Sequence, residues 1–174
     1  MKLPHPRKLR QGAAPFDRHV TGINYGLLDQ LVIYAVRRAQ ISIYEELEPI
    51  LSPLALTPPR FSSLVLIEQN PEILQSDLAR IIGVGRPAMV AIINFLAEQG
   101  WIQRQSHDGD GRANLLILTS KGRTHLAKAK KLIAQLDQRW TSTMSNEERI
   151  SLMALLDRLG PPGACAAAEP ADLV

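Results

Sequence analysis

The 174-residue chain has little of what several classes of protein depend on. It contains a single cysteine, Cys165, so it cannot form an internal disulfide and a reducing cytoplasm is the expected compartment. Aromatic residues make up only 5% of the chain, which argues against a single-strand nucleic-acid binder that stacks bases on aromatic rings. The first 20 residues hold no apolar segment of a secretory signal, and the apolar run 31–36 is far shorter than the ~20 residues of a membrane span. We therefore expect a soluble cytoplasmic protein.

Sequence motifs of common enzymes are also missing. There is no HExxH metalloprotease motif, no paired cysteine ligands, no serine nucleophile elbow and no Walker phosphate loop. One loose pattern, Gly83-x-Gly85-x-x-Ala88, matches the glycine fingerprint of dinucleotide-binding folds. That fingerprint needs a preceding strand and an acidic residue about 20 positions later, and residues 103–105 contain no acid. We expect no enzymatic activity, no metal and no cofactor.

What the chain does contain is typical of a globular protein, with 45% apolar and 21% charged residues. Its net charge of +3 is unevenly placed, because the first 20 positions hold five of the 20 basic residues and one of the 17 acidic residues. Such a basic segment favours contact with phosphate backbones, although a solvated end of the chain is the simpler alternative. We assign residues 1–22 to a basic, flexible N-terminal arm.

The most informative stretch covers residues 74–119, where the pattern predicts a helix, a tight turn, a second helix and a β-hairpin. Ser76 is expected to cap a first helix that ends at Ile82, and the glycines at 83 and 85 supply the turn. Pro87 suits the first turn of the second helix, since no backbone donor is needed there. That helix carries an apolar stripe at i, i+3, i+4 and i+7, formed by Met89, Ile92, Ile93 and Leu96.

Two segments rich in strand formers follow, at 101–104 and 114–118, and the Asp-Gly-Asp-Gly sequence at 108–111 predicts the turn between them. The order of these elements is that of a winged helix-turn-helix. The predicted fold class is mainly α with a small β-wing, and residues 57–119 form the predicted DNA-binding domain.

Long helices are expected on both sides of this domain. A helix beginning near Asn24 is apolar on nearly all sides, so a partner chain is the simplest source of its second cover. Pro49 and Pro53 should kink or end it. Thr57 should cap a helix at about 58–68, Thr119 or Ser120 one at about 121–142, and a capping box of Ser145 and Glu148 one at 146–159. We predict dimerisation helices at 23–56 and 120–159, and a disordered tail at 160–174.

In the order of its motifs, the stretch 56–123 resembles the MarR family of bacterial transcriptional regulators, and the resemblance extends over about residues 24–159. The matching landmarks are Leu56-Thr57, Ser76-Asp77-Leu78-Ala79, Leu96, Gly100-Trp101-Ile102, Asp110-x-Arg112 and Leu118-Thr119-x-x-Gly122. The resemblance implies a homodimer that binds a pseudo-palindromic DNA operator, usually as a repressor. It also implies release by a small phenolic or aromatic carboxylate effector, such as those sensed by regulators of aromatic-acid catabolism.

The resemblance assigns candidate DNA contacts by position. They are Arg86, Ala88, Met89, Ala91 and Asn94 on the second helix, Asp110 and Arg112 in the wing, and Gln75 and Ser76 as phosphate contacts. Family members often carry Ser or Thr near 87–88 and a basic residue near 91, where this chain has Pro, Ala and Ala. With so few hydrogen-bonding side chains, selectivity should rest on two arginines, thymine-methyl contacts and DNA shape. Solvated surface charges are the alternative for both arginines.

Candidate effector-binding residues lie at and just before the long first helix: Arg18, His19, Tyr34, Arg37 and Arg38. An arginine can clamp a carboxylate bidentately, and a histidine or tyrosine can meet a phenolic hydroxyl. For Arg37 and Arg38, dimer salt bridges or a solvated face remain an alternative. The predicted function is a ligand-responsive dimeric DNA-binding regulator. The alternative is a winged-helix protein-interaction module that does not bind specific DNA.

Overall fold

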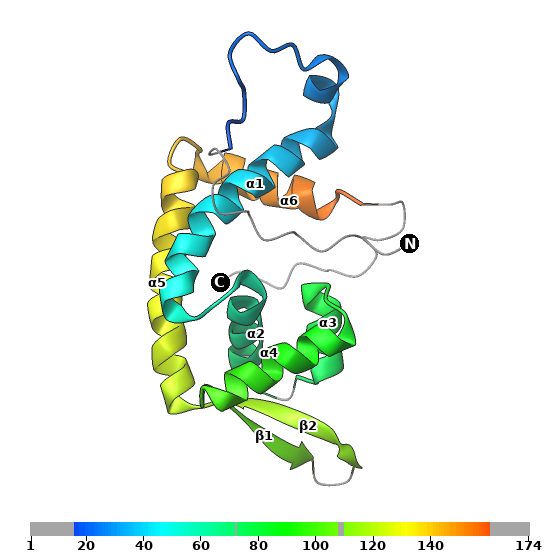
Figure 1. Cartoon of the computed structure of the whole chain (residues 1–174), viewed down its shortest axis with the longest axis vertical. Helices are drawn as coiled ribbons and strands as arrows, with labels where there is room; N and C mark the ends of the chain where they lie inside the picture. The colour runs from blue at the N-terminus through cyan, green and yellow to red at the C-terminus, as the bar shows by residue number, and fades with distance from the viewer. Residues whose placement is uncertain (1–15, 72, 108–109, 161–174) are drawn as a thin grey trace. The chain divides into compact units, whose positions relative to one another are not determined.

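The computed structural model describes residues 16–71, 73–107 and 110–160. Of the described residues, those up to Leu126 form one compact unit and those from Ala127 form a second. Figure 1 labels the helices and strands along the chain. The first unit holds η1 (Gly26–Gln30), α1 (Val32–Leu51), η2 (Ser52–Leu54), α2 (Pro58–Gln69), α3 (Gln75–Ile82), α4 (Arg86–Glu98), β1 (Ile102–His107) and β2 (Asp110–Leu118). Helix α5 (Ser120–Trp140) begins there and continues into the second unit, which also holds α6 (Asn146–Asp157). Within the described residues, no single helix is long and apolar enough to cross a membrane.

A helix-turn-helix forms the centre of the first unit. Helices α3 and α4 bend by 114° at the break between them, within the range typical of this motif. Gly83 makes the turn at a φ of 72°, a left-handed conformation that costs a glycine little. The residues before Gly83 are helical, so the dinucleotide-binding interpretation is wrong. The predicted cap at Ser76 is also wrong, because the helix starts at Gln75 and Leu74 is its N-cap.

The wing is a two-stranded antiparallel sheet in which Ile102 pairs with Leu118 and Ser106 with Asn114. Both strands are longer than predicted, and their register shifts between Ser106 and His107. An isolated bridge between Leu74 and Leu115 ties the start of α3 to β2. The predicted turn at 108–111 lies partly outside the described residues, since 108 and 109 are not among them. The wing is thus joined to the helix-turn-helix by backbone pairing.

The core of this unit lies among α2, α3, α4 and the wing, which contact one another. Its fully or nearly buried side chains are Leu56, Leu64, Ile67, Leu78, Met89, Ile93, Leu96, Trp101, Ile102, Leu116, Leu118 and Leu126. Three of the four residues of the predicted α4 stripe are therefore buried. The fourth, Ile92, is half-buried. The buried hydroxyl of Ser63 donates to the carbonyl of Pro59 at 2.8 Å, so this polar group is satisfied.

The start of α5 packs against the entry to the wing. The hydroxyl of Thr119 accepts from the backbone amide of Gly122 at 2.9 Å, which confirms the predicted cap at this end of the helix. The same hydroxyl lies 2.7 Å from the carbonyl oxygen of Gly100 and donates to it. A Cβ on Gly122 would lie 2.0 Å from the carbonyl oxygen of Trp101, so only glycine allows this approach.

The N-terminal helix begins later than predicted. The side chain of Asn24 accepts from the backbone amide of Gly26 at 2.8 Å, and Gly26 has a φ of 53°. This local turn competes with helix formation, so a short 3-10 helix forms first and α1 starts only at Val32. Pro49 lies inside α1, and the helix ends at Leu51 before Pro53 in η2.

The second unit contains the rest of α5 and all of α6. The predicted capping box is confirmed: Ser145 accepts from the amide of Glu148 at 3.2 Å, and the Glu148 carboxylate accepts from the amide of Ser145 at 2.7 Å. Arg149 of α6 pairs with Asp137 of α5 at 2.9 Å. No residue of α6 is buried, and its large apolar side chains, including Ile150, Met153 and Leu155, are exposed.

Candidate nucleic-acid interface and N-terminal polar cluster

The solvent-facing side of α4 carries most of the predicted base-contacting residues. Arg86 is the first residue of the helix, and Ala88, Ala91 and Asn94 follow on the exposed side. A helix that presents its N-terminal residues in this way can enter the major groove of B-form DNA. Met89 is a correction, because its side chain is 0% exposed and packs in the core. It lies on the apolar stripe, where a side chain supports the helix and cannot reach a base edge.

Asn94 is held by a residue that the sequence did not single out. The Nη2 of Arg104, on β1, donates a hydrogen bond to the amide oxygen of Asn94, on α4. Both side chains are exposed, so the guanidinium stands at the junction of recognition helix and wing. The pairing leaves the amide nitrogen of Asn94 available to donate. Arg104 has only a weak signal in the sequence, because its approach to α4 depends on how the sheet meets the helix.

The first residues of α3 are the predicted phosphate contacts. Ser76 is exposed and Gln75 is half-buried, and both lie in the first turn, where backbone amides lack partners within the helix. Asp77 in the same turn pairs with Arg80 at 3.0 Å in an exposed i, i+3 ion pair. Asp77 therefore partly neutralises Arg80 instead of leaving it as a free cation.

The predicted wing contacts, Asp110 and Arg112, fall on the backbone of β2. Their side chains lie outside the described part of the structure. Their roles in DNA binding stay predictions.

Beyond the C-terminal end of α4, cations and aromatic rings form a stack. The guanidinium of Arg60 lies 3.5 Å from the centre of the Phe95 ring, and Phe95 meets Trp101 edge to face at 5.9 Å. Trp101 is stacked in turn on His125, with centroids 4.0 Å apart and an interplanar angle of 16°. Lys121 donates to the carbonyl of Gln99, the C-cap of α4, at 2.7 Å. These contacts fix the C-terminal end of α4 to α2, to Trp101 just before β1, and to α5.

Both ends of the stack bind the turn that follows α1. His125 Nε2 donates to the carbonyl of Leu54 at 2.9 Å, and Arg60 Nη1 donates to the carbonyl of Ala55 at 3.0 Å. Ala55 has a left-handed backbone with a φ of 53°, an uncommon conformation for a residue with a Cβ, and these two bonds help to hold it. Partial burial lowers the pKa of the Arg60 guanidinium by desolvation, but it remains charged at neutral pH.

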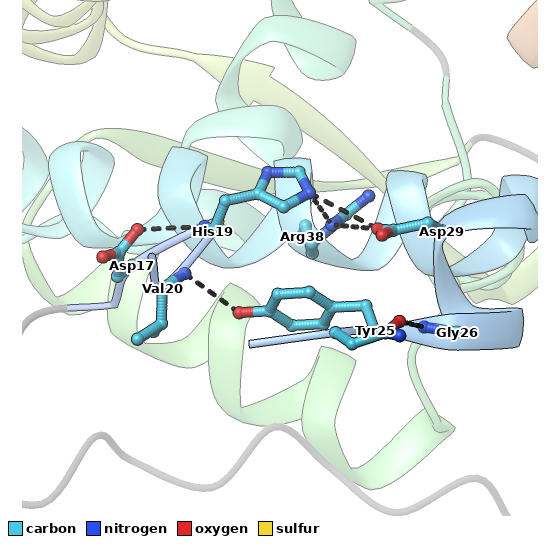
Figure 2. Close-up of polar contacts among 8 residues, drawn as sticks. Asp17, His19, Val20, Tyr25, Gly26, Asp29 and Arg38 are labelled. Carbon is cyan, nitrogen blue, oxygen red and sulfur yellow. Dashed lines mark hydrogen bonds and ion pairs between the residues drawn. The ribbon is translucent and has the colours of Figure 1, made fainter. Parts of the chain in front are cut away.

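A polar cluster forms where the N-terminal segment lies against α1. Figure 2 shows His19, Asp29 and Arg38 converging. Arg38 Nη1 lies 2.7 Å from Nε2 of His19 and 3.2 Å from Oδ1 of Asp29. The rings of Tyr34 and Tyr25 flank it: the Arg38 guanidinium lies 4.8 Å from the centre of Tyr34, and His19 meets Tyr25 edge to face at 5.4 Å. The hydroxyl of Tyr25 accepts from the amide of Val20 at 3.0 Å, which holds the segment in place.

The structure brings three of the five predicted effector residues into one cluster. His19, Tyr34 and Arg38 share the cluster, and Arg18 is bound one helical turn further along, where its Nε donates to the hydroxyl of Ser42 at 3.0 Å. Arg37 is separate, since it is exposed and donates to Gln40 on its own helix. Asp29 was not predicted as a member, because nothing local in the sequence pairs it with a residue nine positions away.

An apolar groove lies in the first unit, among α1, α2 and α3. This groove has a volume of about 460 Å³ and is lined by Tyr44, Pro58, Pro59, Phe61, Ser62, Val65, Leu66, Ile81 and Ile82. Its lining includes no charged side chain and none of the predicted effector residues. The described residues contain no group of three or more His, Cys, Asp or Glu side chains that could hold a metal ion.

Comparison with known proteins places this architecture in a family. Residues 56–113 match the MarR family model. A Thauera aromatica protein, named for regulation of the hcr operon, is 32% identical over 146 residues, which cover 83% of this chain and 88% of the relative.

Solved structures of transcriptional regulators are also similar to this chain. The transcriptional repressor CouR bound to a 23-mer DNA duplex is 36% identical, with a TM-score of 0.74 and coverage of 79% of this chain and 97% of CouR. CouR bound to p-coumaroyl-CoA is similar to the chain with a TM-score of 0.67, at 35% identity and coverage of 77% and 94%. The Mycobacterium tuberculosis MarR family protein Rv2887 in complex with salicylic acid gives a TM-score of 0.60 at 27% identity, with coverage of 75% and 96%. The chain belongs to the MarR family of winged helix-turn-helix transcriptional regulators.

Proposed function

We propose that this protein is a transcriptional repressor that binds duplex DNA through α4 and its wing and releases it when a small aromatic effector binds. The observation that carries the proposal is the exposed side of α4, which begins at Arg86 and ends in the bonded pair of Asn94 and Arg104. A similar chain, CouR, has been solved on a DNA duplex. The sequence similarity extends over nearly the whole of CouR, which supports binding of duplex DNA by this chain as well.

The residues of α4 define how the protein would read DNA. Arg86 suits a bidentate contact with guanine, and the methyl groups of Ala88 and Ala91 suit contact with thymine methyls. Asn94 would donate its free amide hydrogens to an acceptor on a base edge or phosphate. Arg104 would contact a phosphate beside the groove. With few hydrogen-bonding groups on this face, groove shape should supply much of the selectivity.

A homodimer would present two such helices to a pseudo-palindromic operator. Its interface is proposed from the exposed apolar residues of the flanking helices, which in the N-terminal part include Leu27, Val32 and Ile33, with side chains 67%, 63% and 69% exposed. Burying such residues against a partner would be stabilising at about 25 cal/mol per Å². Exposed apolar residues lie in η1 and in α6, on both sides of the DNA-binding domain in the sequence. The way two chains associate through them would therefore set the distance between their two α4 helices.

The effector is proposed to be an aromatic carboxylic acid or a derivative of one. Rv2887 has been solved with salicylic acid and CouR with p-coumaroyl-CoA. In this chain the cluster around Arg38 offers a guanidinium flanked by aromatic rings, whereas the groove beside Tyr44 lacks a charged partner for a carboxylate. The cluster is therefore the proposed site for the anionic group.

The decisive experiment selects binding sites from a randomised duplex library and then footprints the purified protein on the DNA that flanks its own gene. A repressor of this kind should protect a two-fold symmetric site, and salicylate should weaken that protection. Linkage requires the converse as well: operator DNA should lower the affinity for salicylate by the same factor. Failure to enrich any sequence, together with salt-independent mobility on DNA, would contradict the proposal.

A protein-interaction module is the second candidate. It is favoured by one observation: the start of α4 exposes Pro87, Ala88 and Val90, which are apolar. The variant Arg86→Ala separates the two functions. A DNA reader should lose affinity for the selected duplex, whereas a protein-binding surface built on apolar residues should lose none.

A further inference from the structure

The guanidinium of Arg38 already holds a carboxylate from its own chain. Oδ1 of Asp29 accepts from Nη1 at 3.2 Å, and one oxygen on one nitrogen is a weaker arrangement than the bidentate pairing an arginine can make. The Arg38 side chain is 13% exposed, so its charge is largely removed from water and needs a partner. Asp29 is 47% exposed, and solvent weakens the pairing from its side.

His19 makes a second contact with Arg38, and this contact does not prevent another carboxylate from replacing Asp29. Nε2 of His19 lies 2.7 Å from Nη1 of Arg38, which can only donate, and 3.4 Å from Oδ1 of Asp29. The ring occupies one donor of Arg38 without supplying negative charge, so among the described residues of this cluster Asp29 is the anion that faces Arg38.

The segment that carries Asp29 is weakly held. Helix η1 has five residues, none of them buried, and its side chains Leu27 and Leu28 are 67% and 41% exposed. The contacts that position it include the turn at Asn24 and Gly26, the pairing of Asp29 with Arg38, and the 3.4 Å contact of Asp29 with His19. Within one chain little apolar burial would be lost if η1 moved, so displacing Asp29 costs little apart from the contacts of η1 with a partner chain.

We propose that Asp29 is an internal competitor that occupies the carboxylate site of Arg38 until an aromatic carboxylate displaces it. The inference rests on the proposed function, and it adds the mode of regulation at that site. The incoming carboxylate would take Nη1 and a second nitrogen of Arg38, and its ring would lie against Tyr34, which already contacts the guanidinium at 4.8 Å. Displacement frees η1, whose exposed apolar residues belong to the proposed dimer surface.

The test is a calorimetric titration of the full chain with salicylate and with salicylamide, its uncharged analogue. Asp29→Asn removes the competing charge and keeps the size of the side chain, so it should tighten salicylate binding about tenfold and change salicylamide binding less than twofold. Arg38→Gln should abolish salicylate binding in both backgrounds. Asp77→Asn is the matched control, because it removes the charge of another aspartate that pairs with an arginine, the exposed Arg80, and should leave salicylate binding unchanged.

A second readout reports on displacement itself. In the unmodified protein, salicylate should speed amide hydrogen exchange at Leu27 and Leu28, and in Asp29→Asn this exchange should already be fast without ligand. A variant that had merely lost its fold would show fast exchange throughout α1.

The inference is overturned if Asp29→Asn binds salicylate no more tightly than the unmodified protein, if neither binds it, or if Arg38→Gln binds it unchanged. Operator binding measured on the same preparations separates this failure from that of the proposed function. A protein that binds its selected DNA but shows no effect of Asp29→Asn is a repressor without this competitor. A protein that binds no DNA in any variant contradicts the proposed function whatever the titrations show.

Discussion

His125 is expected to stabilise the junction between the recognition helix and the wing through two separate contacts. Its ring is stacked on Trp101 at 4.0 Å, and its Nε2 donates to the carbonyl of Leu54, 71 residues earlier in the chain. An aromatic pair contributes about 0.5–1.5 kcal/mol beyond its buried area. A hydrogen bond contributes about 0.5–1.5 kcal/mol net. Replacing His125 by alanine should therefore lower the free energy of unfolding by about 1–3 kcal/mol.

Two variants of His125 separate the contribution of the stacked ring to stability from that of the hydrogen bond. His125→Phe keeps a stacking ring but loses the hydrogen bond, so it should cost about 0.5–1.5 kcal/mol, less than His125→Ala. The assay is urea unfolding followed by tryptophan fluorescence. It is done in a Trp140→Phe background, so that Trp101 is the only tryptophan and reports on the first unit alone.

A loss below about 0.5 kcal/mol for His125→Ala would refute the reasoning, since it would mean that neither contact contributes. Equal losses for alanine and phenylalanine would refute the stacking part alone. Thr124→Ala is the control at the neighbouring exposed position of α5 and should have a small effect, because its hydroxyl only bonds back to the carbonyl of Ser120.

Three further predictions concern residues whose roles the structure defines. Met89→Ala should destabilise the fold by about 2–5 kcal/mol in urea unfolding and leave base preference in the selection experiment unchanged, because Met89 is fully buried. Gly122→Ala should cost about 3 kcal/mol or more in the same assay, because its Cβ would overlap the carbonyl of Trp101. Ser145→Ala should cost α6 about 1 kcal/mol, measured by hydrogen exchange of its first turn. Separately, the backbone amide of Glu147 and the Ser145 hydroxyl lower the pKa of the Glu147 carboxyl, so the stability that this carboxylate contributes is present above the ordinary glutamate pKa and is lost as pH falls through the lowered one. In Ser145→Ala, a carbon-detected NMR titration should show that pKa closer to its ordinary value.

The helix-turn-helix, the wing and the cap of α6 could be predicted because their sequence signals are local. Gly83 needs a left-handed turn, Ser145 and Glu148 form a cap within three residues, and the α4 stripe repeats at helical spacing. Each of these features is decided by neighbours in the chain. The structure therefore has the turn, the cap and the buried stripe where the sequence predicted them.

The predictions that the structure contradicts share one cause: they depend on contacts between elements, which the local sequence pattern does not determine. Met89 fits both a core stripe and a groove-facing position by spacing, and only the packing of α4 on the core decides between them. The late start of α1 depends on the side-chain bond of Asn24, which competes with the helix. Pairings such as Asp29 with Arg38 and Asn94 with Arg104 depend on how separate elements meet, so periodicity could not reveal them.

The most direct test of the central claim is the salt dependence of operator affinity for single charge variants. The slope of log affinity against log salt falls by about one for each phosphate contact removed. Arg104→Ala should reduce that slope by about one and weaken all sequences alike. Arg86→Ala should instead cost about 1–3 kcal/mol and relax selectivity at one base pair of each half-site. Arg158→Ala, which removes the same charge at the end of α6, should change neither quantity. If all three variants bind with the slope and selectivity of the unmodified protein, the exposed side of α4 and the wing do not read DNA.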